Sequence, residues 1–294
     1  MKAKRKLKAT KKDLFAQVSE RLIEQMEKAQ GDWRKPFIPA GFAMPTNAKT
    51  KKEYQGGNAF FLGMMGGGEW ATYRQWEELG AQVRKGEKST MGIYWATRKK
   101  TDKETGEEID GLLMIPCAFH VFSADQVDGY TGTHESLKDR KPVEKHREAD
   151  RIVKATGAAI RHQQQDRAFY APASDYIGMP DKRQFSSRED YYSVLLHELT
   201  HWTGHKSRLN RFDTVSGSHD REEYAKEELV AEIGAAFLLA RCGLSVQPRE
   251  DHAEYLACWI KHCKSDPRAF YNAATKAQKA VDFILGRQSQ EQAA

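Results

Sequence analysis

Residues 197–201, HELTH, place two histidines four positions apart, with a glutamate directly after the first. On an α-helix these histidines lie about 40° apart, so His197 and His201 can bind one metal ion from the same face. Glu198 is next to that face, where its carboxylate can take a proton from an attacking water. Burying three polar groups in an apolar helix is costly unless they have a partner. The motif therefore predicts a helix that holds one Zn²⁺ per chain.

The residues before the motif support a helix at this point. Ser186 with Glu189, or Ser187 with Asp190, forms a capping pair ahead of an amphipathic run that includes Leu195. A pattern that fixes three of five positions also arises by chance. The surrounding sequence favours a metal-binding helix over coincidence.

The third zinc ligand is not evident from the motif itself. A catalytic zinc site has three protein ligands and leaves one position for water, whereas a structural site is closed by four. The sequence HELTHWTGHKS follows the longer pattern HExxHxxGxxH as far as Gly204 and then has Ser207 where a third histidine is required. His205 is an alternative, although it follows a glycine that is expected to end the helix.

The segment EELVAEIGAAFLLA places two carboxylates in an otherwise apolar helical run. Glu228 and Glu232 lie one turn apart on the same face, where each requires a strong partner. We assign Glu228 as the third ligand and Glu232 as the carboxylate that holds a metal-bound histidine. The reverse assignment remains open. In the plainest alternative, Glu228 is an ordinary surface residue and Glu232 is buried against an arginine.

The first half of the chain is basic and rich in aromatic residues. Residues 1–130 carry 22 Lys and Arg against 17 Asp and Glu, whereas residues 131–294 carry 25 against 24. Rings that stack on unpaired bases and cations that follow phosphates are typical of proteins that bind single-stranded nucleic acid. We expect more than half of the rings in the core. The expected DNA contacts are Trp33, Lys51, Lys52, Tyr54, Asn58, Tyr73, Arg84, Lys85, Lys88 and Trp95.

The distribution of apolar residues predicts an α+β fold with two domains. A small α+β DNA-binding domain is expected over 1–130, a polar linker over 131–146 and a mainly helical domain over 147–294. No segment approaches the ~18 apolar residues of a membrane helix, and no signal peptide is evident. With four scattered cysteines and no CxxC pair, we expect a cytoplasmic protein without a membrane partner.

A coarse assignment of elements follows from periodicity and turn residues. Two strands, MGIYWAT and LLMIPCAFHVF, flank a charged hairpin loop, and the tract 31–69 is expected to be loop-rich. The segment DYIGMP is either an edge strand that pairs with a substrate backbone or a structural strand. Helices are predicted over 13–30, 69–79, 144–161, 221–241 and, as one or two helices, 251–286.

Several longer tracts resemble a known family. NAKTKKEYQGGNAFFL and EWATYRQWEELGAQVRKGEKST, then FHVFSADQ, resemble the N-terminal domain of the ArdC antirestriction family, related domains of which begin some plasmid-borne primases. MPDKRQF, YYSVLLHELTHWTGH and YAKEELVAEIGAAFLLA resemble its zincin-like metallopeptidase domain. The resemblance implies a conjugative-plasmid protein that binds single-stranded DNA and shields incoming DNA from host restriction enzymes. It also implies zinc ligands at His197, His201 and Glu228, with Glu198 as general base.

Together these features predict a zinc-dependent metallopeptidase domain behind a DNA-binding domain, acting in antirestriction. Two alternatives remain open. In the first, the protein only binds single-stranded DNA and its zincin domain has no catalytic role. In the second, it is a DNA-tethered regulatory protease that cleaves a host protein such as a restriction enzyme.

Overall fold

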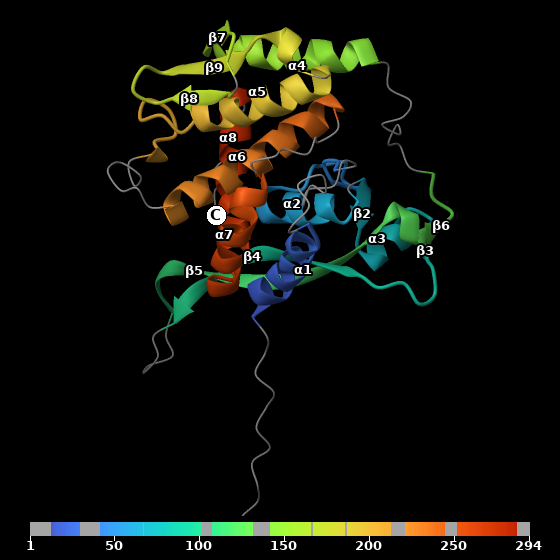
Figure 1. The fold of residues 1–294 in the computed structure, drawn as a ribbon. Helices are drawn as coiled ribbons and strands as arrows, with labels where there is room; N and C mark the ends of the chain where they lie inside the picture. Colours follow the sequence, from blue (N-terminus) through green and yellow to red (C-terminus); the bar gives the residue numbers. More distant parts are fainter. Residues whose placement is uncertain are drawn as a thin grey trace, which may run out of the picture.

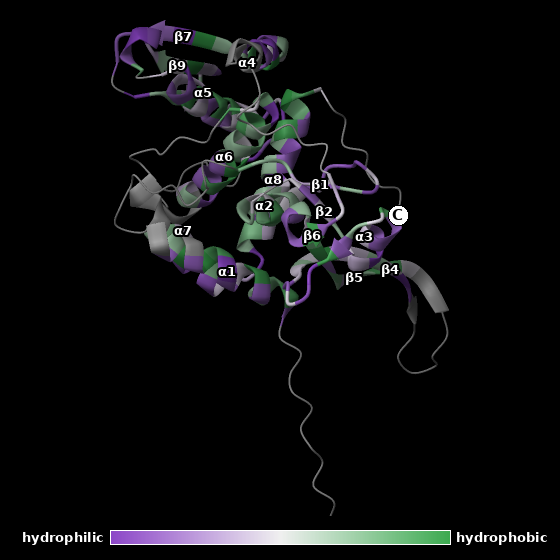
Figure 2. Ribbon diagram, turned by 90° about the vertical axis from the view of Figure 1, so that its right-hand side faces the viewer, coloured by the Kyte–Doolittle hydropathy of each residue, from purple (hydrophilic) through white to green (hydrophobic). Residues whose placement is uncertain are grey.

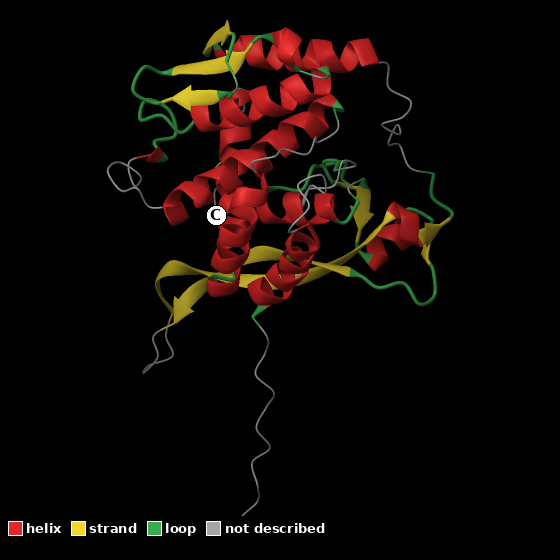
Figure 3. Cartoon of the chain, viewed as in Figure 1, coloured by secondary structure: helices red, strands yellow, loops and turns green. Residues whose placement is uncertain are grey.

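The structure is a computed structural model. It describes residues 13–29, 42–66, 68–101, 108–131, 142–165, 167–185, 187–212, 221–244 and 252–286. Within them, helices form the middle of the molecule, and a four-stranded sheet and a three-stranded sheet lie at opposite ends (Figure 3). The α+β fold is therefore confirmed. In the described residues, no helix is both long enough and apolar enough to span a membrane.

The N-terminal half is built around a long antiparallel ribbon of β4 (Thr90–Thr101) and β5 (Glu108–Ser123). β5 also pairs with β2 (Glu69–Ala71), and β2 pairs with β1 (Thr46–Asn47), which gives the order β1-β2-β5-β4. Further elements of this half are α1 (Leu14–Ala29), α2 (Gly56–Met64), α3 (Tyr73–Glu78), the pair β3 (Gln82–Val83) and β6 (Val127–Asp128), and the 3-10 turn η1 (Ala124–Gln126).

The C-terminal half is mainly helical, as expected. Its small sheet has the order β7-β9-β8 and covers one side of the helices (Figure 1). Its elements are α4 (Pro142–Thr156), β7 (Ala159–Gln163), β8 (Phe169–Ala171), β9 (Tyr176–Pro180), the 3-10 turn η2 (Lys182–Gln184), α5 (Arg188–Trp202), α6 (Arg221–Cys242), α7 (His252–Ser265) and α8 (Ala269–Ile284).

One hydrophobic core runs through both halves, because α8 packs against both α2 and α6. Phe60 of α2 lies between Phe270 of α8 and Phe237 of α6, with ring centroids 6.0 and 6.5 Å away. Gly57 lets α2 approach α8, since a Cβ there would be 2.0 Å from the ring of Tyr271. In Figure 2 the hydrophobic residues gather on α2, α6 and α8. The division into two domains with a linker over 131–146 stays a prediction, and α4 already begins at Pro142.

The helix predicted over 69–79 is wrong in its first part, which forms β2. Trp70 is 2% exposed and packs beside Val121 and Leu62. This burial outweighs the helical spacing of Trp70 and the next two aromatic residues in the sequence. Thr72 then caps α3: its hydroxyl accepts a hydrogen bond from the Gln75 backbone N–H, and the Gln75 side chain accepts one from the Thr72 N–H.

The tract expected to be loop-rich, 31–69, contains a buried helix, α2. Its glycines and its apolar residues on every side hide the helical period, because a helix buried all round has no polar face. Residues 31–41 lie outside the described part of the chain. The other predicted helices are confirmed with small shifts: 144–161 ends earlier, at Thr156, and 251–286 is divided into α7 and α8 near Pro267.

The segment DYIGMP contains β9, which is the middle strand of its sheet, so the alternative of an edge strand is wrong. β9 pairs in parallel with β7 on one side and antiparallel with β8 on the other. Both edges of β9 are thus occupied over Tyr176–Gly178, so this part of the strand cannot pair with the backbone of a substrate. Of the two alternatives, the structural strand is correct.

Candidate functional site

The motif HELTH lies in the C-terminal half of α5. The hydroxyl of Ser187 caps this helix by accepting a hydrogen bond from the Asp190 N–H at 3.0 Å, while Ser186 lies outside the described residues. His197 and His201 point to one side, with their Nε2 atoms 3.1 Å apart. Their exposed fractions are only 1% and 8%, so α5 holds two imidazoles inside the protein rather than on its surface.

α6 brings the carboxylate of Glu228 to the two imidazoles. Its Oε2 lies 3.3 Å from His197 Nε2, and its Oε1 lies 3.3 Å from His201 Nε2. The two helices can approach so closely because α6 has Gly234 opposite Thr200 of α5, where a Cβ would be 2.6 Å from the Thr200 side chain. Three potential ligand atoms from two helices therefore face one another.

A second carboxylate lies at the far nitrogen of each histidine. Glu232 Oε1 is 2.8 Å from His197 Nδ1, and Glu227 Oε1 is 3.5 Å from His201 Nδ1. Carboxylates placed in this way fix the orientation of an imidazole and leave its Nε2 to act as a ligand. Glu228 and Glu232 thus occupy the places that the sequence-based assignment gave them, although their role toward a metal stays a prediction.

The sequence reasoning missed Glu227 and its partner Arg211. Arg211 donates to the Glu227 carboxylate at 2.7 Å and also to Thr203 Oγ1 and the Thr200 carbonyl, at 2.7 and 2.8 Å. The guanidinium is only 7% exposed, so it ties the segment after α5 to α6. The buried pair of carboxylate and arginine considered for Glu232 occurs five residues earlier, at Glu227. The pair of adjacent glutamates at 227 and 228 was the feature of the sequence that could have indicated a role for Glu227.

The electrostatics of the cluster favour a cation. Burial acts to lower the pKa of His201, but the carboxylates of Glu228 and Glu227 outweigh it and raise the pKa to about 10. Burial acts to raise the pKa of Glu228, and the charge of the two histidines holds it well below its usual range. With Glu198 and Glu232 also buried here, the carboxylates outnumber the guanidinium of Arg211. Excess buried negative charge requires a positive partner.

The donor set fits a divalent metal ion. His197, His201 and Glu228 each offer a ligand atom within 4.8 Å of the others, and His205 is not part of this group. In a tetrahedral site with bonds of about 2.0–2.1 Å, neighbouring ligand atoms lie about 3.3 Å apart. The observed separations of 3.1 and 3.3 Å match that spacing. His205 instead bonds to Ser207, with Nδ1 2.7 Å from the hydroxyl.

Two of the expected DNA contacts, Asn58 and Tyr54, pack against or bond to other parts of the protein. The Asn58 side chain accepts from the Ile93 N–H at 2.9 Å and donates to the Ile93 carbonyl at 2.7 Å, which caps the free edge of β4. The Tyr54 ring stacks on Phe119 at 6.2 Å, and burial raises the pKa of its hydroxyl. Both side chains are half-buried, and their role as DNA contacts stays a prediction. Trp33 lies outside the described residues.

The remaining expected DNA contacts have exposed side chains. Lys51 is paired with Glu69 at 2.7 Å, and Trp95, half exposed, packs on Phe15 with centroids 6.0 Å apart. Tyr94, which the sequence reasoning did not select, is equally exposed. The others in this exposed group are Lys52, Tyr73, Arg84, Lys85 and Lys88.

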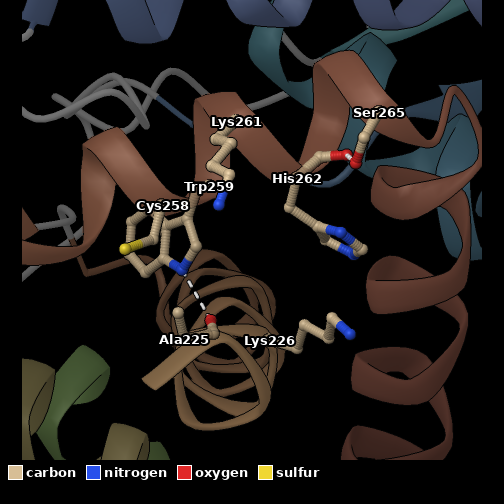
Figure 4. Close-up of a pocket in the computed structure, with 7 residues that line it drawn as sticks. All are labelled: Ala225, Lys226, Cys258, Trp259, Lys261, His262 and Ser265. Carbon is tan, nitrogen blue, oxygen red and sulfur yellow. Dashed lines mark hydrogen bonds between the residues drawn. The ribbon is translucent and has the colours of Figure 1, made fainter. Parts of the chain in front are cut away.

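A small cavity lies between α6 and α7, and neither His197 nor His201 lines it (Figure 4). Trp259 Nε1 donates to the Ala225 carbonyl at 2.6 Å, which fixes α7 against α6 beside this cavity. Lys226 lines it, and because Lys226 is two residues before Glu228 it projects from the other side of α6, about 200° away. Lys226 of α6, together with Lys261 and His262 of α7, thus lines a different surface from the one that carries Glu228.

Both halves of the chain match known families. Residues 12–122 match the N-terminal domain of anti-restriction factor ArdC, and residues 147–276 match a zincin-like metallopeptidase family. A solved structure of the antirestriction ArdC protein from plasmid R388, in a metal-free form, is 39% identical with a TM-score of 0.76, covering 94% of this chain and 97% of that one. A Mn(II)-bound structure of the same protein is 37% identical with a TM-score of 0.73, covering 95% and 100%.

Curated relatives show the same relationship. The uncharacterized protein y4eC of Sinorhizobium fredii is 36% identical, over 96% of this chain and 95% of that protein. Two proteins from Escherichia coli named DNA primase TraC are 41% and 38% identical over 96% and 94% of this chain. The chain spans only 28% and 20% of the length of these two primases.

Proposed function

The chain belongs to the ArdC antirestriction family, and we propose that it binds single-stranded DNA with its N-terminal half and holds one Zn²⁺ for peptide hydrolysis with its C-terminal half. Acting in this way, it protects transferred DNA from host restriction. The observation that carries the metal part is the convergence of His197, His201 and Glu228, with a further carboxylate at each histidine Nδ1.

Each residue of the centre has a distinct role in this proposal. A divalent cation held by His197, His201 and Glu228 supplies Lewis acidity toward a peptide carbonyl and an attacking water. Glu198 is the general base: its carboxylate accepts the proton of the attacking water and passes it to the leaving nitrogen. Glu232 and Glu227 keep the two imidazoles oriented, so that both present Nε2 to the same point.

The peptidase is tested with variants that separate metal binding from turnover. Purified protein loaded with Zn²⁺ or Mn²⁺ is incubated with unfolded casein, with and without a single-stranded oligonucleotide, and cleavage is followed by gel and mass spectrometry. We expect Glu198→Gln to keep its metal and lose cleavage, and His197→Ala to lose both. Undiminished cleavage by Glu198→Gln, or wild-type protein that takes up neither metal, contradicts the proposal.

One observation favours a second candidate, in which the metal only stabilises the fold. His197, Glu198 and His201 are all less than a tenth exposed, and a peptide must reach them for hydrolysis. A transfer assay with restriction-sensitive DNA distinguishes the two candidates. If Glu198→Gln protects the DNA as well as wild type does, the metal centre is structural in antirestriction. If protection is lost while metal content is kept, hydrolysis of a host protein, such as a restriction enzyme, is required.

The DNA-binding part has its own test. Fluorescence anisotropy compares a single-stranded oligonucleotide with the matching duplex over a range of salt concentrations. We expect tighter binding to the single strand, with affinity that falls as salt rises, because cations on this half contact phosphates. Equal binding to both forms contradicts recognition by base stacking.

A further inference from the structure

An open depression lies in the N-terminal half, between α3, the turn after β3, and the end of β5. Residues from these elements and from β6 line it, and they are brought together only by the fold. Its lining includes Tyr73, Gln82, Lys85, Glu87, Phe122 and Asp128.

Two aromatic rings form one wall of the depression. Tyr73 is 44% exposed, and its ring meets Phe122 edge to face, with centroids 6.4 Å apart at 73°. The Gln82 side-chain amide donates to the Tyr73 hydroxyl at 2.8 Å, which fixes the orientation of the exposed ring. A ring held in place and open to solvent is suited to stacking on a planar ligand.

The charges that line the depression cancel. Arg84 and Lys85 are balanced by Glu87 and Asp128, and Arg84 lies 3.2 Å from Glu87 and 3.4 Å from Asp128. A neutral lining is poorly suited to a phosphate and well suited to an uncharged base. Lys85 at the depression and Lys88 just after it are both exposed, and within the described residues neither has an ion-pair partner.

The turn that carries these groups is fixed by η1. Gln126 accepts at its carbonyl from the Arg84 N–H at 3.0 Å, and its side chain donates to Glu87 Oε2 at 2.9 Å and to the Lys88 carbonyl at 3.0 Å. Arg84 in turn donates to the carbonyls of Asp125 and Val127. A site that is ordered in advance binds without the entropic cost of ordering a loop.

We propose that this depression binds one unpaired base of single-stranded DNA, with Tyr73 stacking on the base and Lys85 and Lys88 contacting the flanking phosphates. Gln82 and Glu87 face the edge of the base and supply hydrogen-bonding groups. This inference rests on the proposed function of the N-terminal half, single-stranded DNA binding, and assigns that function to a particular site.

The test uses the full chain, a fluorescent oligo(dT) of 20 nucleotides, and variants of exposed residues. We expect Tyr73→Ala to weaken binding about tenfold at every salt concentration, because stacking does not depend on counterions. Tyr73→Phe keeps the ring and is expected to stay close to wild type. Lys85→Ala and Lys88→Ala are each expected to reduce the slope of log affinity against log salt by about 0.7, the value for one phosphate contact on a single strand.

Tyr94→Ala is the matched control, since Tyr94 of β4 is 50% exposed, close to the 44% of Tyr73, but does not line the depression. Circular dichroism and thermal melting confirm that each variant is folded. Unchanged affinity in Tyr73→Ala, or a loss in Tyr94→Ala that exceeds it, overturns the assignment while leaving single-stranded DNA binding intact. Wild-type protein that does not bind oligo(dT) refutes the proposed DNA-binding function itself.

Discussion

The candidate metal centre and the candidate base site adjoin different hydrophobic clusters and are built in opposite ways. The metal centre joins two long helices, α5 and α6, and each of its side chains is less than a tenth exposed. The base site joins short elements, α3, β3 and β6, with the end of β5, and its main ring is nearly half exposed. The metal centre is buried, whereas the base site lies at the surface of the protein.

This difference sets what a substitution does at each place. In the metal centre, ligand binding and folding use the same buried groups, so a substitution there changes both. At the base site, the side chains that meet a ligand contribute little to the core, so a substitution changes affinity and leaves stability nearly unaltered.

His197→Ala is expected to have the largest effect, on metal binding and on stability together. It removes a ligand and leaves Glu228 and Glu232 buried beside a missing imidazole, which costs about 3–5 kcal/mol. Tm should fall by roughly 10 °C and metal content should fall to none, as measured by calorimetry and by mass spectrometry of bound metal. Tyr73→Ala is the contrasting variant, with an unchanged Tm. A His197→Ala protein as stable as wild type would show that the metal centre does not contribute to the stability of the fold.

Glu227→Gln is expected to have the next largest effect, this time on metal affinity. The amide that replaces the carboxylate cannot accept from both the Arg211 guanidinium and the His201 Nδ1–H as a carboxylate does, so the orientation of His201 is less restricted. Affinity for Zn²⁺ should fall about 10- to 100-fold in competition with a chromogenic chelator.

The control for Glu227→Gln is Glu53→Gln. It breaks a comparable ion pair, Glu53 with Arg241 at 2.8 Å, on a part of α6 distant from the histidines. This control is expected to lower Tm without changing metal affinity. Equal affinity losses in both variants would mean that Glu227 acts on the metal only through overall stability.

The individual residues of the candidate metal centre could be predicted from the sequence, because buried polar groups restrict one another. Spacing on one helix places His197 beside His201, and a carboxylate in an apolar run requires a partner, which selects Glu228 and Glu232. Glu227 was missed for a physical reason: its partners are Arg211, from the segment after α5, and His201. A contact between residues 16 positions apart in the sequence, such as Arg211 and Glu227, leaves no periodic pattern.

The surface of the N-terminal half was harder to predict, because composition does not say which side chains the core uses. Asn58 and Tyr54 match the residue types of a DNA site, yet the edge of β4 and the ring of Phe119 engage them. Phe122 and Gln82 were not selected, since they only meet Tyr73 once β5 and β3 lie next to α3. The loop-like tract that contains α2 was misjudged because a helix buried on all sides has no amphipathic pattern.

Gly234→Ala tests whether close packing of α5 on α6 sets the geometry of the metal centre. The new Cβ would lie 2.6 Å from the Thr200 side chain, which is fully buried and cannot move aside. We expect a loss of about 1–3 kcal/mol in the free energy of unfolding, with weaker metal binding because Glu228 is displaced from the histidines. Adding Thr200→Ala makes room and should restore most of the metal affinity. Failure of this rescue would show that the two helices do not limit each other's approach.

Asn58→Ala is expected to have the smallest effect. It decides whether Asn58 supports the fold or contacts DNA. Its two hydrogen bonds to Ile93 close the free edge of β4. Their loss should lower the free energy of unfolding by about 1–2 kcal/mol in urea denaturation, because each bond contributes roughly 0.5–1 kcal/mol at this half-buried position. Affinity for oligo(dT) should stay at the wild-type value, because the side chain faces the backbone of β4. The opposite result, full stability with weakened DNA binding, would make Asn58 a DNA contact and extend the binding surface from the base site to the ribbon.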